Sequence, residues 1–147
     1  MSLATSVETS TAPSLSLQDL FARYHVGWET RDPELIASLH SQDSVFHLHD
    51  GSEPVHGRDA LRRHCAGLFA RFEFGFEMGR RLYGPDHWVF EWTMVLSLRE
   101  PGGAAFTARV EMLDVVTLNR AGEVARKDVY MNGAQAQAAF ARAGIAR

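Results

Sequence analysis

The sequence has a single cysteine, no long hydrophobic run and no signal-like start. Each of these features bears on the cellular location that is expected for the protein. Cys65 has no second cysteine for an internal disulfide, so a reducing cytoplasm is permitted and is the expected location. No apolar stretch reaches the roughly 20 residues that cross a bilayer. The N-terminus lacks the basic start and the apolar core of a secretory signal, so secretion is not expected.

The charge balance excludes further classes of partner. The chain has 15 Lys and Arg residues against 18 Asp and Glu, a formal net charge of -3, and no run of basic residues. Nucleic acids and anionic membranes are bound through clustered positive charge, so neither is expected as a partner. A small neutral or weakly charged molecule fits this composition better.

Length and composition favour one globular domain. Hydrophobic residues make up 46% of the 147 residues and charged residues 22%, which is usual for such domains. Residues 1–15 are rich in Ser and Thr and lack periodic apolar positions, so they are expected to form a mobile N-terminal tail. The domain itself is expected over 16–147, with no internal repeat.

Apolar positions three and four residues apart predict four helices. Ser16 and Asp19 resemble a capping box at the start of the first helix. Asp32 is the expected cap of the second helix, in which Pro33 takes the first position. Cys65 lies at an apolar position of the third, where a buried, inert thiol is expected. The predicted helices cover 16–29, a short segment from Pro33, a segment after Gly57, and 134–143.

Alternation of apolar and polar residues predicts the strands. The expected strands are 44–49, 72–79, 88–96, 107–118 and about 123–132. Short turns rich in Gly and Pro join the last four, which makes them antiparallel neighbours. With the helices on one face of the sheet, the fold class is α+β. The same argument excludes a parallel nucleotide-binding sheet, and no glycine-rich phosphate loop is present.

Two polar residues are expected to point into the apolar interior. Asp114 stands among Val, Met and Leu on the inner face of its strand, where an unpaired carboxylate is costly. It must therefore be protonated, as an oxyanion donor would be, or held by backbone or Arg for structural reasons. Tyr24 lies on the apolar side of the first helix, and its phenol can donate beside Asp114 or simply pack in the core.

His47 and His49 stand two residues apart in the strand 44–49, hence on one face, and either could act as a general base. Alternation makes Phe46 and Leu48 the core residues, which puts both histidines on the opposite face unless a bulge intervenes. The pair could also supply half of a tetrahedral metal site. The candidates for the remaining ligands are His56, His64, Glu53 and Asp50. No pattern fixes them, so no metal is predicted; the other histidines, His25, His40 and His87, are assigned to surface or structure.

Aromatic and apolar residues of the predicted inner face are numerous enough to line a ligand pocket. The chain has three Trp and nine Phe, and small-molecule sites are mostly apolar with few polar groups. A ring-bearing or terpenoid-like ligand is therefore expected. The residues assigned to substrate binding are Trp28, Phe46, Leu48, Phe90, Trp92, Met94, Met112, Val129 and Met131.

Three segments resemble the nuclear transport factor 2-like superfamily, and within it the SnoaL-like and ketosteroid-isomerase-like small enzymes. They are LFARYHVGWETRDPELIASL, HDGSEPVHGRDAL and LDVVTLNRAGEV, and the resemblance covers about 17–132. It implies a cone-shaped, curved antiparallel sheet with the N-terminal helices packed on its concave face, and a homodimer. The superfamily includes isomerases, dehydratases, cyclases, epoxide hydrolases, lyases and non-catalytic binders.

The resemblance also suggests roles for single residues. Tyr24 looks like the oxyanion-binding tyrosine of ketosteroid isomerase, and Asp114 like its protonated oxyanion-binding aspartate. The position of that enzyme's catalytic base holds Leu48, between His47 and His49. Val129 stands where the epoxide-hydrolase branch places an acid.

These observations lead to a functional hypothesis and an alternative. The hypothesis is a cofactor-free acid–base enzyme of isomerase, dehydratase, cyclase or lyase type, acting on a hydrophobic cyclic or aromatic molecule. In it Tyr24 and Asp114 polarise a substrate oxygen while His47 or His49 moves a proton on carbon. The alternative is a non-catalytic pocket protein that binds an apolar metabolite. An enzyme needs a titrating base beside the ligand, whereas a binder needs only the apolar lining.

Overall fold

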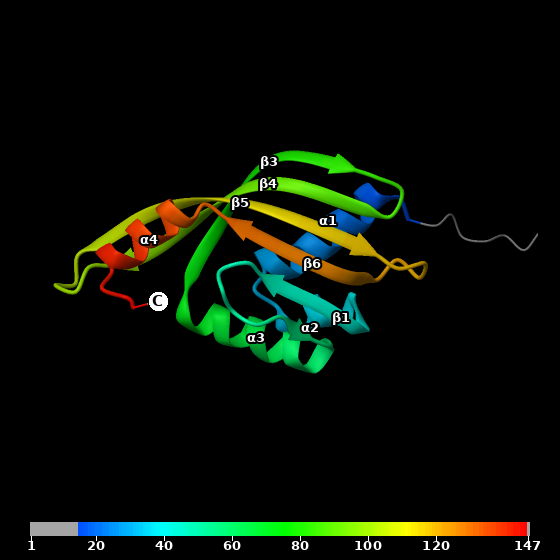
Figure 1. Ribbon diagram of the computed structural model, residues 1–147, viewed down its shortest axis with the longest axis horizontal. Helices are drawn as coiled ribbons and strands as arrows, with labels where there is room; N and C mark the ends of the chain where they lie inside the picture. Colours follow the sequence, from blue (N-terminus) through cyan, green and yellow to red (C-terminus); the bar gives the residue numbers. More distant parts are fainter. Residues whose placement is uncertain (1–14, 147) are drawn as a thin grey trace, which may run out of the picture.

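A strongly curved, open sheet of six strands wraps around the N-terminal helices in the computed structural model, which describes residues 15–146 (Figure 1). The elements are α1 (Leu17–Glu29), α2 (Pro33–Ser38), β1 (His40–Leu48), β2 (Val55–His56), α3 (Arg58–Arg71), β3 (Glu73–Tyr83), β4 (His87–Arg99), β5 (Ala105–Leu118), β6 (Val124–Met131) and α4 (Gly133–Arg142). The predicted α+β fold, with helices on the concave face, is confirmed. The expected tail lies, except for Leu15, outside the described residues.

The helices begin at the caps that the sequence indicates. The Ser16 side chain accepts from the backbone N–H of Asp19 over 3.1 Å, and the Asp32 side chain accepts from the N–H of Leu35 over 3.1 Å. Each bond satisfies one of the backbone donors left free in a first helical turn. Gly57 precedes α3 with φ of 83°, a left-handed conformation that favours glycine.

The strand order β2-β1-β6-β5-β4-β3 contains one parallel pair. Strands β3 to β6 are antiparallel neighbours, as their short turns predict. Strand β1 runs parallel to β6, with Phe46 opposite Lys127. The hairpin argument did not foresee this pair because β1 and β6 are far apart in the sequence and no turn joins them. The early start of β1 at His40 was also missed, since a register shift between His40 and Val45 breaks the alternation there.

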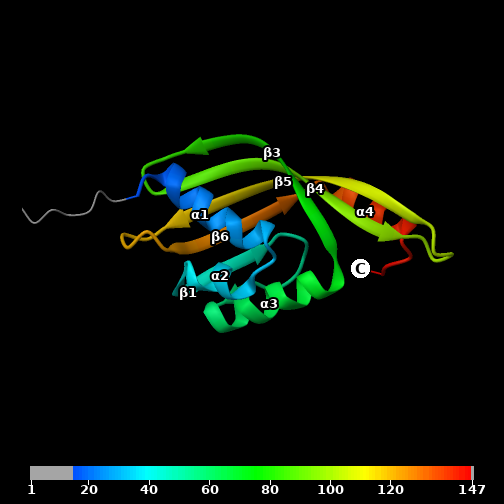
Figure 2. The same ribbon diagram turned by 180° about the vertical axis from the view of Figure 1, so that it is seen from behind.

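A bulge in the outer strand accompanies the bend of the sheet. The pairing of β3 with β4 shifts register between Met78 and Arg81, and such bulges increase local twist and bending. Gly79 lies within this shift, where a Cβ would come 2.8 Å from the carbonyl oxygen of Glu91. Figure 2 shows the curved strands from behind, with α1, α2 and α3 on their inner side. The curvature leaves an enclosed space between sheet and helices.

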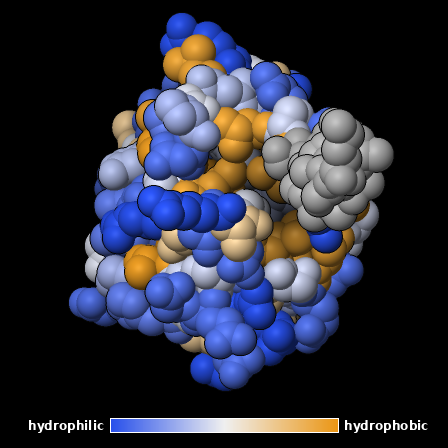
Figure 3. All heavy atoms as spheres, turned by 90° about the vertical axis from the view of Figure 1, so that its right-hand side faces the viewer, coloured by the Kyte–Doolittle hydropathy of each residue, from blue (hydrophilic) through white to orange (hydrophobic). Residues whose placement is uncertain are grey.

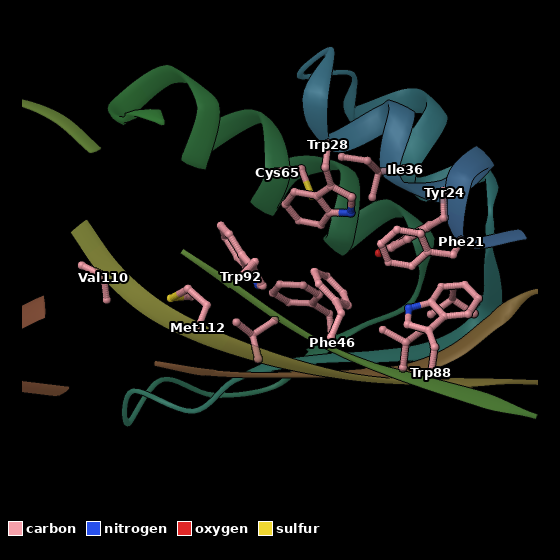
Figure 4. Close-up of a cluster of buried hydrophobic side chains, with 14 of the residues drawn as sticks. Phe21, Tyr24, Trp28, Ile36, Phe46, Cys65, Trp88, Trp92, Val110 and Met112 are labelled. Atoms are coloured by element: carbon pink, nitrogen blue, oxygen red, sulfur yellow. The ribbon is translucent and has the colours of Figure 1, made fainter. Parts of the chain in front are cut away.

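Aromatic side chains fill much of this space (Figure 4). Trp88 is 1% exposed and meets Phe21 edge-on, with ring centroids 5.5 Å apart. Cys65 on α3 is fully buried, and burial raises the pKa of its thiol to about 12, so the expected inert cysteine is confirmed as a buried thiol. None of the described helices is long and apolar enough to cross a membrane.

Candidate active site

Two cavities flank Tyr24, which contributes to the wall of each. The end cavity, about 860 Å³, lies between the start of α1 and the β5–β6 turn and carries charged residues such as Arg23, Asp86 and Arg120. Figure 3 shows apolar surface in a hollow at this end of the molecule. The inner cavity, about 480 Å³, lies between the helices and the curved sheet and contains a buried pair of opposite charges. Buried ionisable groups in an apolar cleft are typical of functional sites, so the inner cavity is the candidate site.

The inner cavity is lined by every residue that the sequence assigned to substrate binding. These nine residues are Trp28, Phe46, Leu48, Phe90, Trp92, Met94, Met112, Val129 and Met131. Further aromatic side chains complete the wall, namely Phe21, Phe72, Phe74, Phe76 and Phe140. The predicted apolar lining is therefore present, while its contact with a substrate remains a prediction.

Asp114 and Lys127 form an ion pair in the wall of the inner cavity. Lys127 Nζ lies 3.2 Å from Asp114 Oδ2, and Trp92 Nε1 donates to Asp114 Oδ1 over 2.8 Å. The two residues are 1% and 4% exposed, respectively. Both carboxyl oxygens thus face a donor, an arrangement that favours the carboxylate over the acid. The structural partner of Asp114 was foreseen among backbone or Arg, but the partners are Trp92 and Lys127. The expected protonation of Asp114 stays a prediction.

Aromatic rings surround the Lys127 ammonium. Nζ lies 4.2 Å from the ring centroid of Trp28, 5.0 Å from that of Tyr24, 5.9 Å from Phe90 and 6.0 Å from Phe46. Aromatic faces attract cations, and this attraction strengthens when water is removed. The rings and Asp114 together replace part of the hydration that the ammonium loses on burial.

Burial shifts both members of the pair toward their neutral forms. The pKa of Asp114 is raised because burial disfavours the carboxylate, with the Lys127 charge and the Trp92 hydrogen bond opposing the shift. The pKa of Lys127 is lowered because burial disfavours the ammonium, with Asp114 opposing. The cost of moving a proton between the two groups is therefore smaller than it would be in water. The pair can act as an acid and a base within one apolar site.

Lys127 is the functional candidate that the sequence analysis missed. It is the only lysine in the chain, and all the other basic residues counted with it are arginines. It also shares the alternation of Val129 and Met131 on β6, both of which were assigned to the pocket. Those two signals were readable from the sequence, but lysine is so rarely buried that its default assignment is to solvent.

Tyr24 makes its polar contact away from Asp114. Its hydroxyl and His40 Nε2 share a hydrogen bond of 2.8 Å, and both side chains are buried. Burial raises the pKa of the Tyr24 phenol well above its usual range, so the hydroxyl stays protonated. Tyr24 lines the inner cavity, and the partner of its hydroxyl is a histidine that the sequence analysis did not foresee. His40, assigned from the sequence to surface or structure, is fully buried.

His47 and His49 lie on the outer face of the sheet. Phe46 and Leu48 line the inner cavity, so alternation turns the two histidines away from it. His49 Nε2 lies 2.8 Å from Asp128 Oδ1, and its ring stacks on Tyr130 with centroids 4.1 Å apart. The expected base of the inner cavity is therefore not one of these histidines, because no bulge intervenes between Val45 and Leu48.

The outer face does hold one group of possible metal ligands among the described residues. Ligand atoms of His47, His49 and Asp128 lie within 4.8 Å of one another. However, Arg126 donates to both Asp128 oxygens, over 2.8 Å and 2.9 Å. The carboxylate charge is thus already balanced by a guanidinium. None of the additional ligands considered from the sequence belongs to this group.

Replacing His47 and His49 together by Ala is expected to leave ligand binding in the inner cavity unchanged. Both side chains are separated from that cavity by the sheet, and surface changes of this kind shift free energies by about 0.5 kcal/mol or less, roughly a factor of two. Quenching of Trp28 and Trp92 fluorescence by a cavity ligand would measure the affinity, with and without a chelator. A tenfold weaker affinity of the double variant would show that the histidines contribute to binding, and a tenfold weaker affinity in the presence of chelator would show that a metal does.

Other polar side chains in the inner cavity are candidates for proton transfer. His25 on α1, assigned to surface or structure from the sequence, lines the cavity, as does His64 on α3. Burial lowers the pKa of both, so each is favoured as a neutral imidazole. Asp50 and Ser52 lie at the cavity wall in the loop after β1, and the Ser52 N–H donates to Asp50 over 2.9 Å.

Comparison with known proteins identifies a family and a fold. The sequence profile of SnoaL-like domains matches residues 21–127, most of the chain. The search of curated proteins found no match to this chain. A protein from Catenulispora acidiphila with a ketosteroid-isomerase-like fold, solved in complex with trimethylamine, has a TM-score of 0.70 and 17% identity, over 87% of this chain and 94% of that one.

Two further solved structures are similar. A candidate SnoaL-like polyketide cyclase from Shewanella denitrificans has a TM-score of 0.72 and 12% identity, over 82% of this chain and 93% of that one. The epoxide hydrolase/cyclase-like enzyme SalBIII, connected with pyran ring formation in the polyether salinomycin, has a TM-score of 0.65 and 18% identity. That match covers 80% of this chain and 92% of SalBIII. At these identities the likeness concerns the fold, whose members differ in chemistry.

Proposed function

This chain belongs to the SnoaL-like domain family, and from that premise we propose that it is a cofactor-free acid–base enzyme. Its substrate would be a hydrophobic cyclic or aromatic molecule held in the inner cavity, and the reaction an isomerisation, cyclisation, dehydration or lyase cleavage. The observation that carries the proposal is the Asp114–Lys127 pair, with 3.2 Å between Nζ and Oδ2, at an aromatic cavity wall. The two solved structures described as cyclase or cyclase-like support the class of reaction.

The pair suggests a division of labour. Lys127 would donate a hydrogen bond to a substrate oxygen that gains negative charge, the role assigned from the sequence to Tyr24 and Asp114. Asp114 would accept a proton from the carbon next to that oxygen. A carbonyl oxygen and a hydrogen on the adjacent carbon are close enough to meet two groups 3.2 Å apart. Trp92, bonded to the other carboxylate oxygen, would hold Asp114 in place.

The cavity wall indicates the kind of substrate. Aromatic rings of Trp28, Phe46 and Phe90 face the space beside Lys127. Flat rings stack favourably on such walls, and a cavity of about 480 Å³ accommodates a molecule of two or three fused rings. Exclusion of water from this space strengthens the electrostatic effect of the pair on the reacting atoms.

Asp114→Asn is expected to lower turnover of a cyclic ketone substrate at least about 100-fold, the usual contribution of a general base. The amide retains an oxygen that can accept from Trp92, but it leaves the buried Lys127 ammonium without its carboxylate, so the folded fraction of the variant is measured by circular dichroism alongside its turnover. The matched control is Asp128→Asn, which makes the same change on the outer face beside His49. A panel of cyclic ketones, phenols and terpenoid-like compounds would be screened for hydrogen exchange at carbon by NMR, followed by product analysis.

The pH profile gives a second readout. Asp114 must be ionised and Lys127 protonated, so activity falls on the acid side through the raised pKa of Asp114 and on the alkaline side through the lowered pKa of Lys127. If compounds bind in the cavity but neither exchange nor react, a non-catalytic binding protein is the correct interpretation. Equal activity of Asp114→Asn and the parent would remove the pair from the mechanism.

A further inference from the structure

From the position of the only lysine of the chain, we propose that Lys127 reacts covalently with aldehydes and ketones in the inner cavity, forming an imine. The inference rests on the proposed function for its choice of cavity and adds the substrate class, a carbonyl compound. Lys127 is 4% exposed, lines the cavity, and has Asp114 Oδ2 3.2 Å from its Nζ. An amine, an acid and an apolar space for the carbonyl compound are thus assembled at one point.

The surroundings of Nζ favour the nucleophilic form of the amine. Imine-forming lysines are activated when an apolar pocket disfavours the ammonium. Here only 4% of Lys127 is exposed, and burial lowers the pKa of its ammonium. The facing rings of Trp28 and Tyr24 offset part of this loss of hydration. Asp114 can take up the proton that the ammonium gives away, because burial raises the pKa of that carboxyl. The pair keeps the same net charge through this transfer.

The choice of lysine over arginine strengthens the case. For an ion pair alone, a guanidinium offers a carboxylate two parallel hydrogen bonds and is the better partner. This chain uses arginine at every other basic position, including the exposed pair of Arg80 with Glu91. Arginine cannot lose its proton in a protein, whereas lysine can. The single lysine therefore occupies a position where its side chain can lose a proton and react as a primary amine.

The covalent step balances within the site. Lys127 transfers a proton to Asp114, and the neutral amine attacks the carbonyl carbon to give a carbinolamine, whose nitrogen proton passes to oxygen. Asp114 then returns its proton to the hydroxyl, which leaves as water while the nitrogen lone pair forms the carbon–nitrogen double bond. The products are a protonated imine, one water molecule and the Asp114 carboxylate. The positive imine draws electrons from the adjacent carbon and makes its hydrogens more acidic.

The test is reductive trapping on the full chain. The protein is incubated with β-tetralone, or in parallel with cinnamaldehyde, in the presence of sodium cyanoborohydride, which reduces protonated imines in preference to free carbonyl groups, and its intact mass and peptide map are measured. The expected result is one adduct per chain, with the mass of the probe less one oxygen, on the peptide that contains Lys127. The α-amino group of the N-terminus is the other primary amine of the chain, and peptide mapping separates the two.

Controls keep the result interpretable. Lys127→Arg removes the amine and retains the charge, so its adduct at this peptide should vanish while N-terminal labelling stays. Should that variant fail to fold, the alcohol β-tetralol serves instead: it fills the cavity without a carbonyl and should suppress labelling of Lys127 in the parent. Labelling confined to the N-terminus, or labelling of Lys127 that β-tetralol leaves unchanged, would overturn the proposal.

The outcome is separable from that of the proposed function. Turnover that depends on Asp114 without any trapped adduct would leave acid–base catalysis standing and refute the imine. An adduct on Lys127 without turnover of any ketone would support covalent capture and refute the catalytic assignment.

Discussion

The double variant Lys127→Met with Asp114→Asn is expected to have a free energy of unfolding within about 1 kcal/mol of that of the parent protein, although Lys127→Met alone costs about 3–5 kcal/mol. The single change leaves the Asp114 carboxylate, 1% exposed, without its positive partner. The double change leaves no charge in the wall, and the amide introduced at position 114 still offers an oxygen to Trp92. Urea unfolding of the three proteins measures the difference.

The single variant should also carry a pH signature. The pKa of Asp114 is already raised by burial, and loss of Lys127 removes a charge that lowers it. A carboxyl whose pKa is higher in the folded than in the unfolded protein favours folding at low pH and loses that contribution as pH rises through the folded value. The deficit of Lys127→Met should therefore shrink on acidification, while the double variant shows no such trend.

An exposed pair provides the matched control. Arg80 and Glu91 lie 2.9 Å apart with side chains 67% and 51% exposed, and such pairs contribute about 0–1 kcal/mol. Arg80→Met should accordingly change stability much less than Lys127→Met. A double variant as unstable as the single one would show that packing of the lysine stem, rather than its charge, is what the wall requires. Whatever its free energy of unfolding, the double variant should have no turnover, because it lacks both proposed catalytic groups. The pair's contribution to activity can then be measured apart from its contribution to stability.

The parts of the fold that local pattern controls were predictable from the sequence. Caps such as Ser16 and Asp32 satisfy donors within three residues, and period-two alternation identifies the inner face of a strand wherever the register is unbroken. Eight of the nine apolar residues assigned to the cavity follow from that alternation, as does the inward position of Asp114, while Trp28 follows from the apolar side of α1. The outward position of His47 and His49 follows from the same rule.

Contacts between distant segments were not predictable. The pairing of Asp114 with Lys127 depends on which strands lie side by side, and the bond of Tyr24 to His40 depends on a register shift at the start of β1. Alternation places Lys127 on the inner face of β6, but the sequence analysis did not consider it, and lysine is rarely buried. A carboxylate predicted to be buried requires a partner, and the solitary lysine on an inward position is the partner that this reasoning could have found.

Acidification is expected to destabilise the protein through His40. Burial lowers the pKa of His40 to about 3 from 6.5, with the charges of Lys127 and Arg58 adding to the shift. Below about pH 6.5 the unfolded chain therefore binds a proton at His40 that the folded chain does not bind. The free energy of unfolding decreases as the pH falls. The stability from this group is complete above 6.5 and declines toward 3. The slope approaches about 1.4 kcal/mol per pH unit, a total on the order of 5 kcal/mol.

His40→Gln tests the assignment. Glutamine cannot take up a proton, so the variant should be less stable than the parent at neutral pH, where it loses the Tyr24 contact, but its stability should change less on acidification. His87→Gln is the control, since that histidine is 43% exposed in its side chain and lies outside the core. Thermal unfolding across the pH range would compare all three proteins.

A parent and a His40→Gln variant with equal acid sensitivity would move the effect to His25 and His64, whose pKa values burial also lowers. The distinction matters for the site. His40 contacts Tyr24, which lies in the wall of both cavities and beside Lys127. Protonation of His40 would bring a positive charge next to the aromatic wall and make Nε2 a donor to the Tyr24 hydroxyl. Loss of ligand binding that follows the same acid transition would tie the stability of this contact to the integrity of the cavity.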